Sequence, residues 1–239
     1  MRVFDGKVAL VTGAGGGIGR ALVAALAEGG ASFALCGRSE AKLRESGRIA
    51  EDLGAQVLLI PGDLTDPACP AESVSRAVER FGQLDMLINN AGEVLNKPIE
   101  SVTLEEYDRV MAVNVRAPFL FCQAALSHLR AVRGTILNIG SVVSHKGYPM
   151  QSVYGASKHA LLGLTKALAN EVFKDGVRVH MLSPGGVLTA MATPARPDLL
   201  PEELILPEEI AELTVFLLTR KTAVIDEIQT HRPGKEPFA

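Results

Sequence analysis

The stretch ALVTGAGGGIGRALVAAL, residues 9–26, decides the fold. It begins as an apolar, β-rich run, breaks into glycines between Gly13 and Gly19, and continues with apolar residues at helical spacing. The glycines therefore lie between a predicted strand and a predicted helix. A turn of this kind leaves backbone N–H groups and the positive end of the helix dipole available to an anion such as a pyrophosphate. The alternative is a tight strand-to-helix turn that binds nothing.

The rest of the chain repeats this alternation of short apolar runs and amphipathic segments. The runs predict strands at Lys7–Val11, Ser32–Cys36, Val57–Pro61, Met86–Asn89, Thr135–Ile139, Val177–Leu182 and Val224–Gln229. Helical patterns lie between them, and three of these patterns end in glycine, at Gly29 and Gly30, at Gly54 and at Gly82. Near-continuous apolar strands that alternate with helices indicate a parallel sheet covered on both faces. We therefore predict an α/β fold, with residues 1–239 forming a single doubly wound Rossmann-type domain around a seven-stranded parallel sheet.

Composition narrows the function classes. A chain of 239 residues with 47% hydrophobic residues can bury one substantial core. Its formal net charge of -3 gives none of the basic surplus that marks a nucleic-acid-binding protein. The three cysteines are too few and too far apart for a disulfide framework, and no Cys/His cluster indicates a metal. Without a signal peptide or a run of about 18 apolar residues, the expectation is a soluble cytoplasmic protein with no membrane partner.

The second strand ends in residues that bear on the choice of a dinucleotide. A dinucleotide fold places a residue that contacts the adenosine ribose about 20 residues after the glycine turn. Here Gly37 is followed by Arg38, which cannot accept a hydrogen bond from a ribose 2′-hydroxyl but can bind a 2′-phosphate. Ser39 can add a hydroxyl donor, whereas the glycine turn itself contains no basic residue. These residues favour NADP(H) over NAD(H), and the alternative is that Arg38 is a solvated surface charge.

By these features the chain resembles the short-chain dehydrogenase/reductase family, almost from end to end. The motifs that carry the resemblance are TGAGGGIG (12–19), GDLTD (62–66), NNAG (89–92), VNVRAPF (113–119), NIGSV (138–142), YGASK (154–158) and SPGGVLTAM (183–191). The resemblance implies that residues 63–64 flank the adenine and that residues 90–92 form the floor beside the cofactor. It also implies that residues 187 and 189 hold the carboxamide of the nicotinamide. The implied cofactor-binding residues are Gly13, Gly15, Gly17, Ile18, Gly19, Arg38, Ser39, Asp63, Leu64, Asn90, Ala91, Gly92, Tyr154, Lys158, Pro184, Gly185, Val187 and Thr189.

The candidate catalytic residues are Asn114, Ser141, Tyr154 and Lys158. Tyr154 and Lys158 are four residues apart on a predicted helix, so their side chains share one face. A free tyrosine has a pKa of about 10, and a neighbouring ammonium lowers it toward the range useful for general acid–base catalysis. Ser141 would hydrogen-bond the substrate oxygen as negative charge develops on it. The resemblance implies that Asn114 holds a helix bend and a water that relays protons. A chance Tyr–Lys spacing and a serine that only ends a strand are the alternatives.

The substrate is less defined by the sequence. The resemblance implies exchange between a carbonyl and a secondary alcohol, on a ketone or a 3-oxo or 3-hydroxy acid. The implied pocket residues are Val143, Ser144, Tyr148, Met150 and Gln151, under a lid at about 190–206. His145 and Lys146 are interpreted as solvated loop residues, and the alternative is that they contact a carboxylate or phosphate of the substrate. An acidic carrier protein would bind arginines at the rim of the substrate pocket, and few arginines are expected there. A small soluble substrate is therefore favoured over a carrier-bound one.

Two other function classes share this fold, a redox sensor that binds NADP without turnover and a scaffold that binds no cofactor. The presence of all four candidate catalytic residues favours an enzyme. The resemblance also implies that the helix containing YGASK pairs across a two-fold axis, so we expect a homodimer or homotetramer.

Overall fold

The computed structural model of the chain describes residues 2–190, 200–220 and 222–235. Its centre is a seven-stranded sheet in the order β3-β2-β1-β4-β5-β6-β7, in which every neighbouring pair is parallel. The strands are β1 Val8–Thr12, β2 Ser32–Gly37, β3 Val57–Pro61, β4 Met86–Asn89, β5 Thr135–Ile139, β6 Arg178–Pro184 and β7 Glu227–Thr230. The predicted parallel sheet is confirmed.

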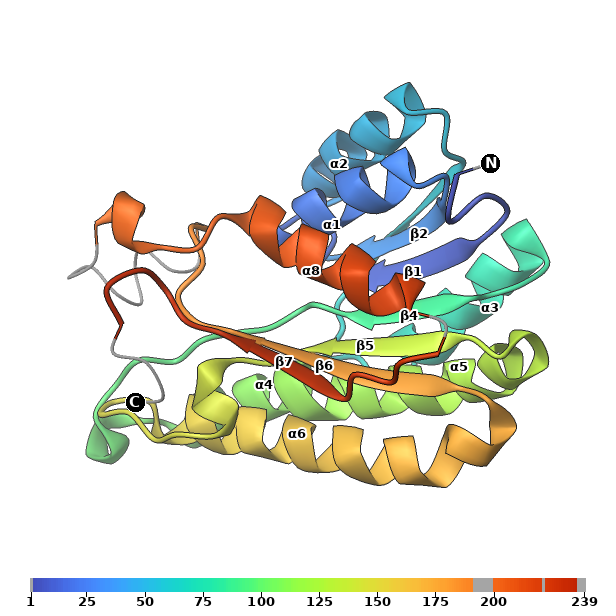
Figure 1. The fold of residues 1–239 in the computed structure, drawn as a ribbon. Coiled ribbons are helices and arrows are strands. Elements are labelled where there is room, and N and C mark those ends of the chain that lie inside the picture. The colour runs from blue at the N-terminus through green and yellow to red at the C-terminus, as the bar shows by residue number, and fades with distance from the viewer. Residues whose placement is uncertain (1, 191–199, 221, 236–239) are drawn as a thin grey trace.

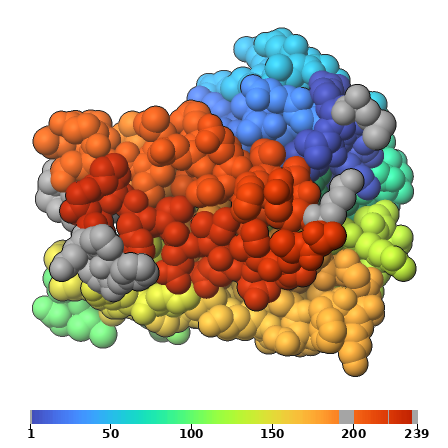
Figure 2. Space-filling model, viewed as in Figure 1, coloured from blue at the N-terminus to red at the C-terminus, as the bar shows by residue number. Residues whose placement is uncertain are grey.

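Helices cover both faces of the sheet (Figure 1). Apolar residues of α1, α2 and α8 pack together on one face, and those of α3, α5 and α6 pack on the other. The helices are α1 Gly17–Glu28, α2 Glu40–Asp52, α3 Cys69–Phe81, α4 Leu104–Met111, α5 Ala117–Val132, α6 Ser152–Val172 and α8 Pro207–Thr219. In the same view, the orange and red residues of α8 and of the chain that follows it cover much of the face that is shown (Figure 2).

The strand ends differ from the sequence prediction mainly at the last two strands. β6 extends to Pro184, because its ladder with β7 continues through the pairing of Pro184 with Thr230. β7 begins at Glu227, three residues later than predicted, because Glu227 is the first residue that pairs with β6, opposite Met181. Val224, where the prediction started this strand, is 67% exposed.

One long helical segment runs from Leu104 to Val132 and is interrupted by a π-helical turn, Ala112–Arg116. By length and composition alone it is apolar enough to cross a membrane. Phe121 and Leu129 on this segment are completely buried against the sheet and its neighbouring helices. The segment therefore contributes to the hydrophobic core.

The three cysteines are free and buried. Burial raises the pKa of Cys36 and of Cys122 to about 12, so both are uncharged thiols that pack as small apolar side chains.

The strand order places a ligand site at one edge of the sheet. The chain runs outward from β1 to β3 and then returns to β4 on the other side of β1. In doubly wound sheets, ligands bind outside the carboxyl ends of the strands at such a reversal. A cleft of about 1090 Å³ lies there, lined by residues that follow β1, β2, β4, β5 and β6.

Candidate active site

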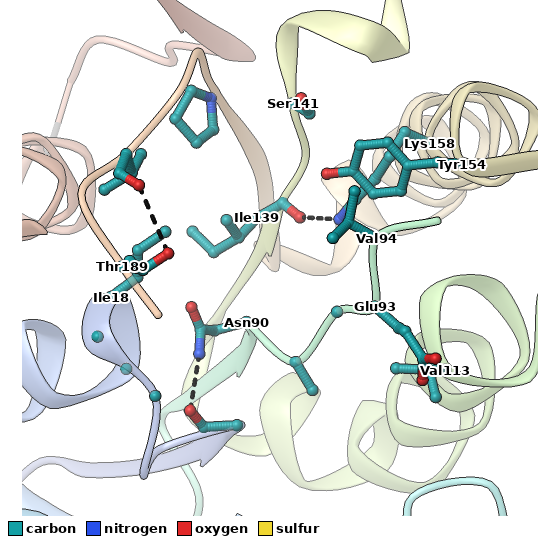
Figure 3. A pocket seen from close by; sticks show the side chains of 18 of the residues that line it. Ile18, Asn90, Glu93, Val94, Val113, Ile139, Ser141, Tyr154, Lys158 and Thr189 are labelled. Carbon is teal, nitrogen blue, oxygen red and sulfur yellow. Dashed lines mark hydrogen bonds between the residues drawn. The ribbon is translucent and has the colours of Figure 1, made fainter. Parts of the chain in front are cut away.

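The glycine turn after β1 is built so that its backbone faces the cleft. Gly13 has φ +64, a left-handed conformation that favours glycine. A Cβ on Gly13 would lie 2.8 Å from the Cα of Ala91, on the segment after β4. Asn90 Nδ2 donates to the carbonyls of Thr12 and Gly13 at 2.9 and 3.1 Å (Figure 3). These contacts join the turns after β1 and β4 at the reversal of the strand order.

Two of the glycines in this turn have no room for a side chain. A Cβ on Gly15 would lie 2.7 Å from the Cβ of Lys42, and one on Gly17 would lie 2.7 Å from Cγ2 of Thr189. Gly16 caps α1 without any side-chain hydrogen bond, and the first turn of α1 contains no acidic residue. The N–H groups that open α1 therefore have no side-chain anion beside them, which fits a pyrophosphate.

The end of the cleft beside β2 carries positive charge. Arg38 lines the cleft and is exposed. Ser39 Oγ accepts a hydrogen bond from the N–H of Lys42 at 3.4 Å and so caps α2, which leaves the Ser39 hydroxyl proton able to donate. The pKa of Asp63 is lowered mainly by hydrogen bonds from Thr65, and the charge of Arg38 adds to this effect.

Lys42 is a basic residue that sequence reasoning missed at this end. The glycine turn contains no cation, as predicted, but Lys42 reaches the same cleft from the first turn of α2. Its position four residues after Arg38 was the available signal. The second basic group that seemed absent from the sequence is therefore supplied by a helix rather than by the turn.

Lys158 is buried on α6 and points toward the sheet. Its Nζ donates to the carbonyl of Ile139 at 2.9 Å, at the end of β5 (Figure 3). Burial lowers the pKa of Lys158 to about 8. Tyr154 projects from the same helix, and Lys158 Nζ lies 5.9 Å from the centroid of its ring. The predicted common face of the two side chains is therefore observed.

The expected lowering of the pKa of Tyr154 is wrong for this structure. Burial raises the pKa of Tyr154, and the side chain of Ser141 opposes this effect only in part. The physical reason is that loss of water penalises the phenolate, while the Lys158 ammonium is engaged with the Ile139 carbonyl. The phenol is thus held in its protonated form.

Ser141 lines the cleft and caps the short helical turn that follows β5. Its Oγ accepts a hydrogen bond from the N–H of Val143 at 3.3 Å and starts the short helical turn Val142–Ser144. Ser144 Oγ accepts a hydrogen bond from the N–H of Ser141 at 3.3 Å, so Ser144 stabilises the same turn. Ser144 is buried and does not line the cleft, which corrects its prediction as a pocket residue.

Asn114 lies in the π-helical turn and is completely buried, away from the cleft lining. Its Oδ1 accepts from the N–H of Glu93 at 2.8 Å, and its Nδ2 donates to the carbonyl of Glu93 at 2.8 Å. The same Nδ2 donates to Ser157 Oγ at 2.9 Å. Asn114 therefore ties the segment after β4 to α6, and the predicted helix bend is the π turn itself.

All other predicted catalytic and cofactor-binding residues line this one cleft. Of the predicted pocket residues, those that also line it are Val143, Tyr148, Met150 and Gln151. His145 is more than a solvated residue, because its Nε2 lies 2.6 Å from Oε1 of Glu227. Most of the predicted lid, residues 191–199, lies outside the described residues. Of its described part, Ala190 and Leu204 line the cleft.

Several cleft residues have no counterpart in the sequence prediction. They include Lys42, Glu93, Val94, Asn96, Arg109, His231, Arg232 and Lys235. Glu93 directly follows the NNAG motif, which was the signal for the segment after β4. No sequence pattern predicts that the chain after β7 returns to the cleft, because this depends on how that chain packs beside Gly185.

Known proteins share this arrangement. A family model described as short chain dehydrogenase matches residues 7–200. An uncharacterized oxidoreductase of Thermotoga maritima is 41% identical over 183 residues, which is 76% of this chain and 72% of that protein. A short chain dehydrogenase of Burkholderia cenocepacia, solved in complex with NADP, is 32% identical with a TM-score of 0.89, over 96% of this chain and 98% of that chain.

A third comparison extends over nearly the whole of both chains. An alcohol dehydrogenase of Thermococcus sibiricus, solved with 5-hydroxy-NADP, is 30% identical with a TM-score of 0.90, over 97% of this chain and 98% of that chain. The matched model covers the sheet from β1 through β6 together with the cleft-lining turns that follow these strands. The chain belongs to the short-chain dehydrogenase/reductase family of oxidoreductases.

Proposed function

We propose that the protein interconverts a carbonyl and a secondary alcohol with NADP(H), and that Tyr154 is its general acid and base. The observation that carries this proposal is that Tyr154, Lys158 and Ser141 line the same cleft as the glycine turn after β1. A dinucleotide on that turn and a substrate at Tyr154 would share one enclosed space. NADP(H), when bound, supplies or accepts the hydride.

The protein's own groups handle the proton and the developing charge. Tyr154, whose pKa burial raises, keeps its proton near neutral pH and can donate it to a substrate oxygen during reduction. Ser141 can donate a second hydrogen bond to that oxygen as its negative charge grows. Lys158 contributes a buried amino group beside the tyrosine ring. Asn114 is a positioning residue, because it acts through Glu93 and Ser157.

The preference for NADP(H) over NAD(H) rests on charge. Arg38 and Lys42 both line the end of the cleft where a 2′-phosphate would lie, and the carboxylate there, Asp63, is engaged by Thr65. Solved relatives from Burkholderia cenocepacia and Thermococcus sibiricus are complexes with NADP and 5-hydroxy-NADP, which supports the same choice. Residues 1–239 would act as one cofactor-binding domain of a cytoplasmic homo-oligomer on a small soluble substrate.

A binding and turnover assay tests the proposal against its alternatives. The intrinsic fluorescence of NADPH reports binding, and its absorbance reports oxidation on ketones and oxo esters, with the reverse reaction followed on hydroxy acids and NADP. The proposal expects both binding and turnover of at least one substrate class. NADPH binding with no turnover across the panel would identify a sensor, and no binding would identify a scaffold.

A further inference from the structure

We propose that the substrate carries a small anionic group, a carboxylate or a phosphate, which Lys146 and Lys235 bind at the substrate end of the cleft. This inference rests on the proposed function, since it names the class of carbonyl compound that the same site accepts. Its two lysines come from segments far apart in the sequence, the loop before α6 and the chain after β7.

Tyr148 brings the two lysines together. Lys146 Nζ lies 5.9 Å and Lys235 Nζ lies 5.7 Å from the centroid of the Tyr148 ring. Tyr148 and Lys235 both line the cleft that contains Tyr154, and Lys146 is exposed and contacts the Tyr148 ring from outside this lining. The aromatic ring attracts each ammonium and so keeps both beside Tyr148.

The backbone after β7 is shaped to return to the cleft. The N–H of Lys235 donates to the carbonyl of Arg232 at 3.2 Å, and Gly234 has φ +71, so residues 232–235 form a tight turn. The backbone of Arg232 lies close to Gly185, since a Cβ on Gly185 would be 3.2 Å from the backbone nitrogen of Arg232. The chain after β7 and the loop before α6 lie at the same end of the molecule (Figure 1).

The carboxylates and cations near these lysines are paired with other residues, so both lysines can bind an anion from outside the protein. The carboxylate of Glu93 is paired with Arg109 at 2.6 Å, and Arg232 is paired with Glu203 at 3.4 Å. Among the residues that the structure describes, neither Lys146 nor Lys235 forms an ion pair with a carboxylate. Both ammonium groups lie within 6 Å of one ring centroid, so an anion bound beside Tyr148 would be close to two positive charges that no described carboxylate neutralises.

The site fits a small acid better than a neutral ketone. A carbonyl at Tyr154 and an anionic group at the two lysines would fix the substrate at two points within one cleft. Charge-assisted hydrogen bonds from an ammonium to a carboxylate or phosphate are stronger than neutral ones. The lysines therefore select for an acid over its ester.

The test compares oxo acids with their own methyl esters. The probes are 3-oxobutanoate, 4-oxopentanoate and 5-oxohexanoate, each with its methyl ester, and dihydroxyacetone phosphate as the phosphate arm. For each, kcat/KM with NADPH is measured on the wild-type protein and on the variant Lys146→Gln/Lys235→Gln. The control is Lys174→Gln, because Lys174 also lies over an aromatic ring, 5.8 Å from the Phe173 centroid, but follows the end of α6 that is remote from Tyr154 and Tyr148.

We expect one acid to be preferred over its ester by about tenfold per lysine contact, or about 100-fold for two. The double variant should lose that preference through a fall in kcat/KM for the acid, while the ester rate, which also reports correct folding, stays within about twofold. Lys174→Gln should change neither rate. Preference for dihydroxyacetone phosphate over the carboxylates would identify the anion as a phosphate.

Two further outcomes are separable. If esters react as well as acids and the double variant leaves this ratio unchanged, the inference is wrong while the proposed function stands. If no probe is turned over, the proposed function fails for these substrates, and thermal shift with 3-hydroxybutanoate and its methyl ester decides the inference. A shift with the acid that the double variant abolishes supports the anion site, and equal or absent shifts overturn it.

Discussion

At the scale of single residues, we expect Arg38 to set the preference between the two nicotinamide cofactors. Its guanidinium can make charge-assisted hydrogen bonds to a 2′-phosphate that NADH lacks. We expect Arg38→Ala to weaken NADPH binding by about tenfold, to change NADH binding little, and to make the preference less sensitive to salt. Fluorescence titration of both cofactors at low and high salt measures these changes.

The matched control for this variant is Arg44→Ala. Arg44 lies on the same helix, α2, pairs with Glu40 at 2.7 Å and does not line the cleft. Its removal should leave both affinities unchanged. Equal affinity of the wild-type protein for NADH and NADPH would mean that Arg38 is a solvated surface charge.

Lys158 links the site to stability through its pKa. Its pKa falls from 10.5 in the unfolded chain to about 8 in the folded protein, so the unfolded chain binds more protons between these values. The cost of burying the charge is fully present below pH 8 and disappears as the pH rises to 10.5. Lys158→Met removes this cost, so the variant should be stabilised at pH 7 by up to about 3 kcal/mol, less about 1 kcal/mol for the lost hydrogen bond to Ile139.

Urea unfolding at pH 7 and pH 10 measures this effect. The stability difference between Lys158→Met and the wild-type protein should shrink as the pH rises. Lys166→Met, an exposed lysine on the same helix, provides the baseline. A difference that does not depend on pH between 7 and 10 would show that the folded pKa of Lys158 is not lowered.

At the scale of elements, the π-helical turn between α4 and α5 holds the site through one buried amide. Asn114→Ala leaves the N–H and carbonyl of Glu93 without their partner and removes one of the two hydrogen bonds of the Ser157 hydroxyl, which keeps its bond to the Tyr154 carbonyl. Each buried polar group left unsatisfied costs about 1–3 kcal/mol, so we expect a loss of about 3 kcal/mol or more in the free energy of unfolding. Chemical denaturation measures it.

Asn170→Ala is the control for that loss. Asn170 is exposed on α6 and its Nδ2 makes a single hydrogen bond, to the carbonyl of Lys166 at 2.8 Å. We expect a change within about 0.5 kcal/mol, as is usual for surface substitutions. If Asn114→Ala is no more destabilising than Asn170→Ala, the amide does not hold the two segments together.

The sequence predicts the elements well where local signals agree. The runs Val57–Pro61, Met86–Asn89 and Thr135–Ile139 are strands with the predicted bounds. Gly82 ends α3 in the left-handed conformation, as expected of a glycine stop. The π turn is not predictable in this way, because it depends on the contacts of Asn114 with segments distant in the sequence. The ends of β6 and β7 depend likewise on their mutual pairing.

At the scale of the whole molecule, one face of α6 is rich in small exposed residues. Ala156, Gly163 and Ala167 are exposed on this helix, and the half-buried Leu164 lines a shallow groove with Phe119 of α5, which is 47% exposed. We expect this face to pair with a second copy, giving a dimer or tetramer of the 25.3 kDa chain by light scattering at micromolar concentration.

Gly163→Arg tests this pairing. No atom lies within 4 Å of a Cβ built on Gly163, so the protomer itself has space for the arginine, whereas a paired helix would not. The variant should dissociate to the protomer, while Ser75→Arg on the exposed face of α3 should not change the mass. A wild-type protein that is already monomeric would rule out the expected assembly.

Only part of the cleft lining can be predicted from the sequence. The motifs identify the residues after β1, β2, β4, β5 and β6, because parallel strands bring their carboxyl ends to one edge. The direction of the shift in the pKa of Tyr154 was not predictable, since it depends on how completely packing removes water from the ring. The approach of Lys235 to Tyr148 was not predictable either, because the turn after β7 sets it.

We expect Tyr154 to transfer the proton to and from the substrate oxygen. Tyr154→Phe removes only the phenolic oxygen and keeps the ring beside Lys158. The measurement is the rate of NADPH oxidation on the best substrate, together with NADPH affinity by fluorescence. We expect the affinity to stay nearly unchanged and the turnover to fall by a factor of about 100 to 10,000, the usual size of a lost general acid. Turnover at the wild-type rate in Tyr154→Phe would contradict the account.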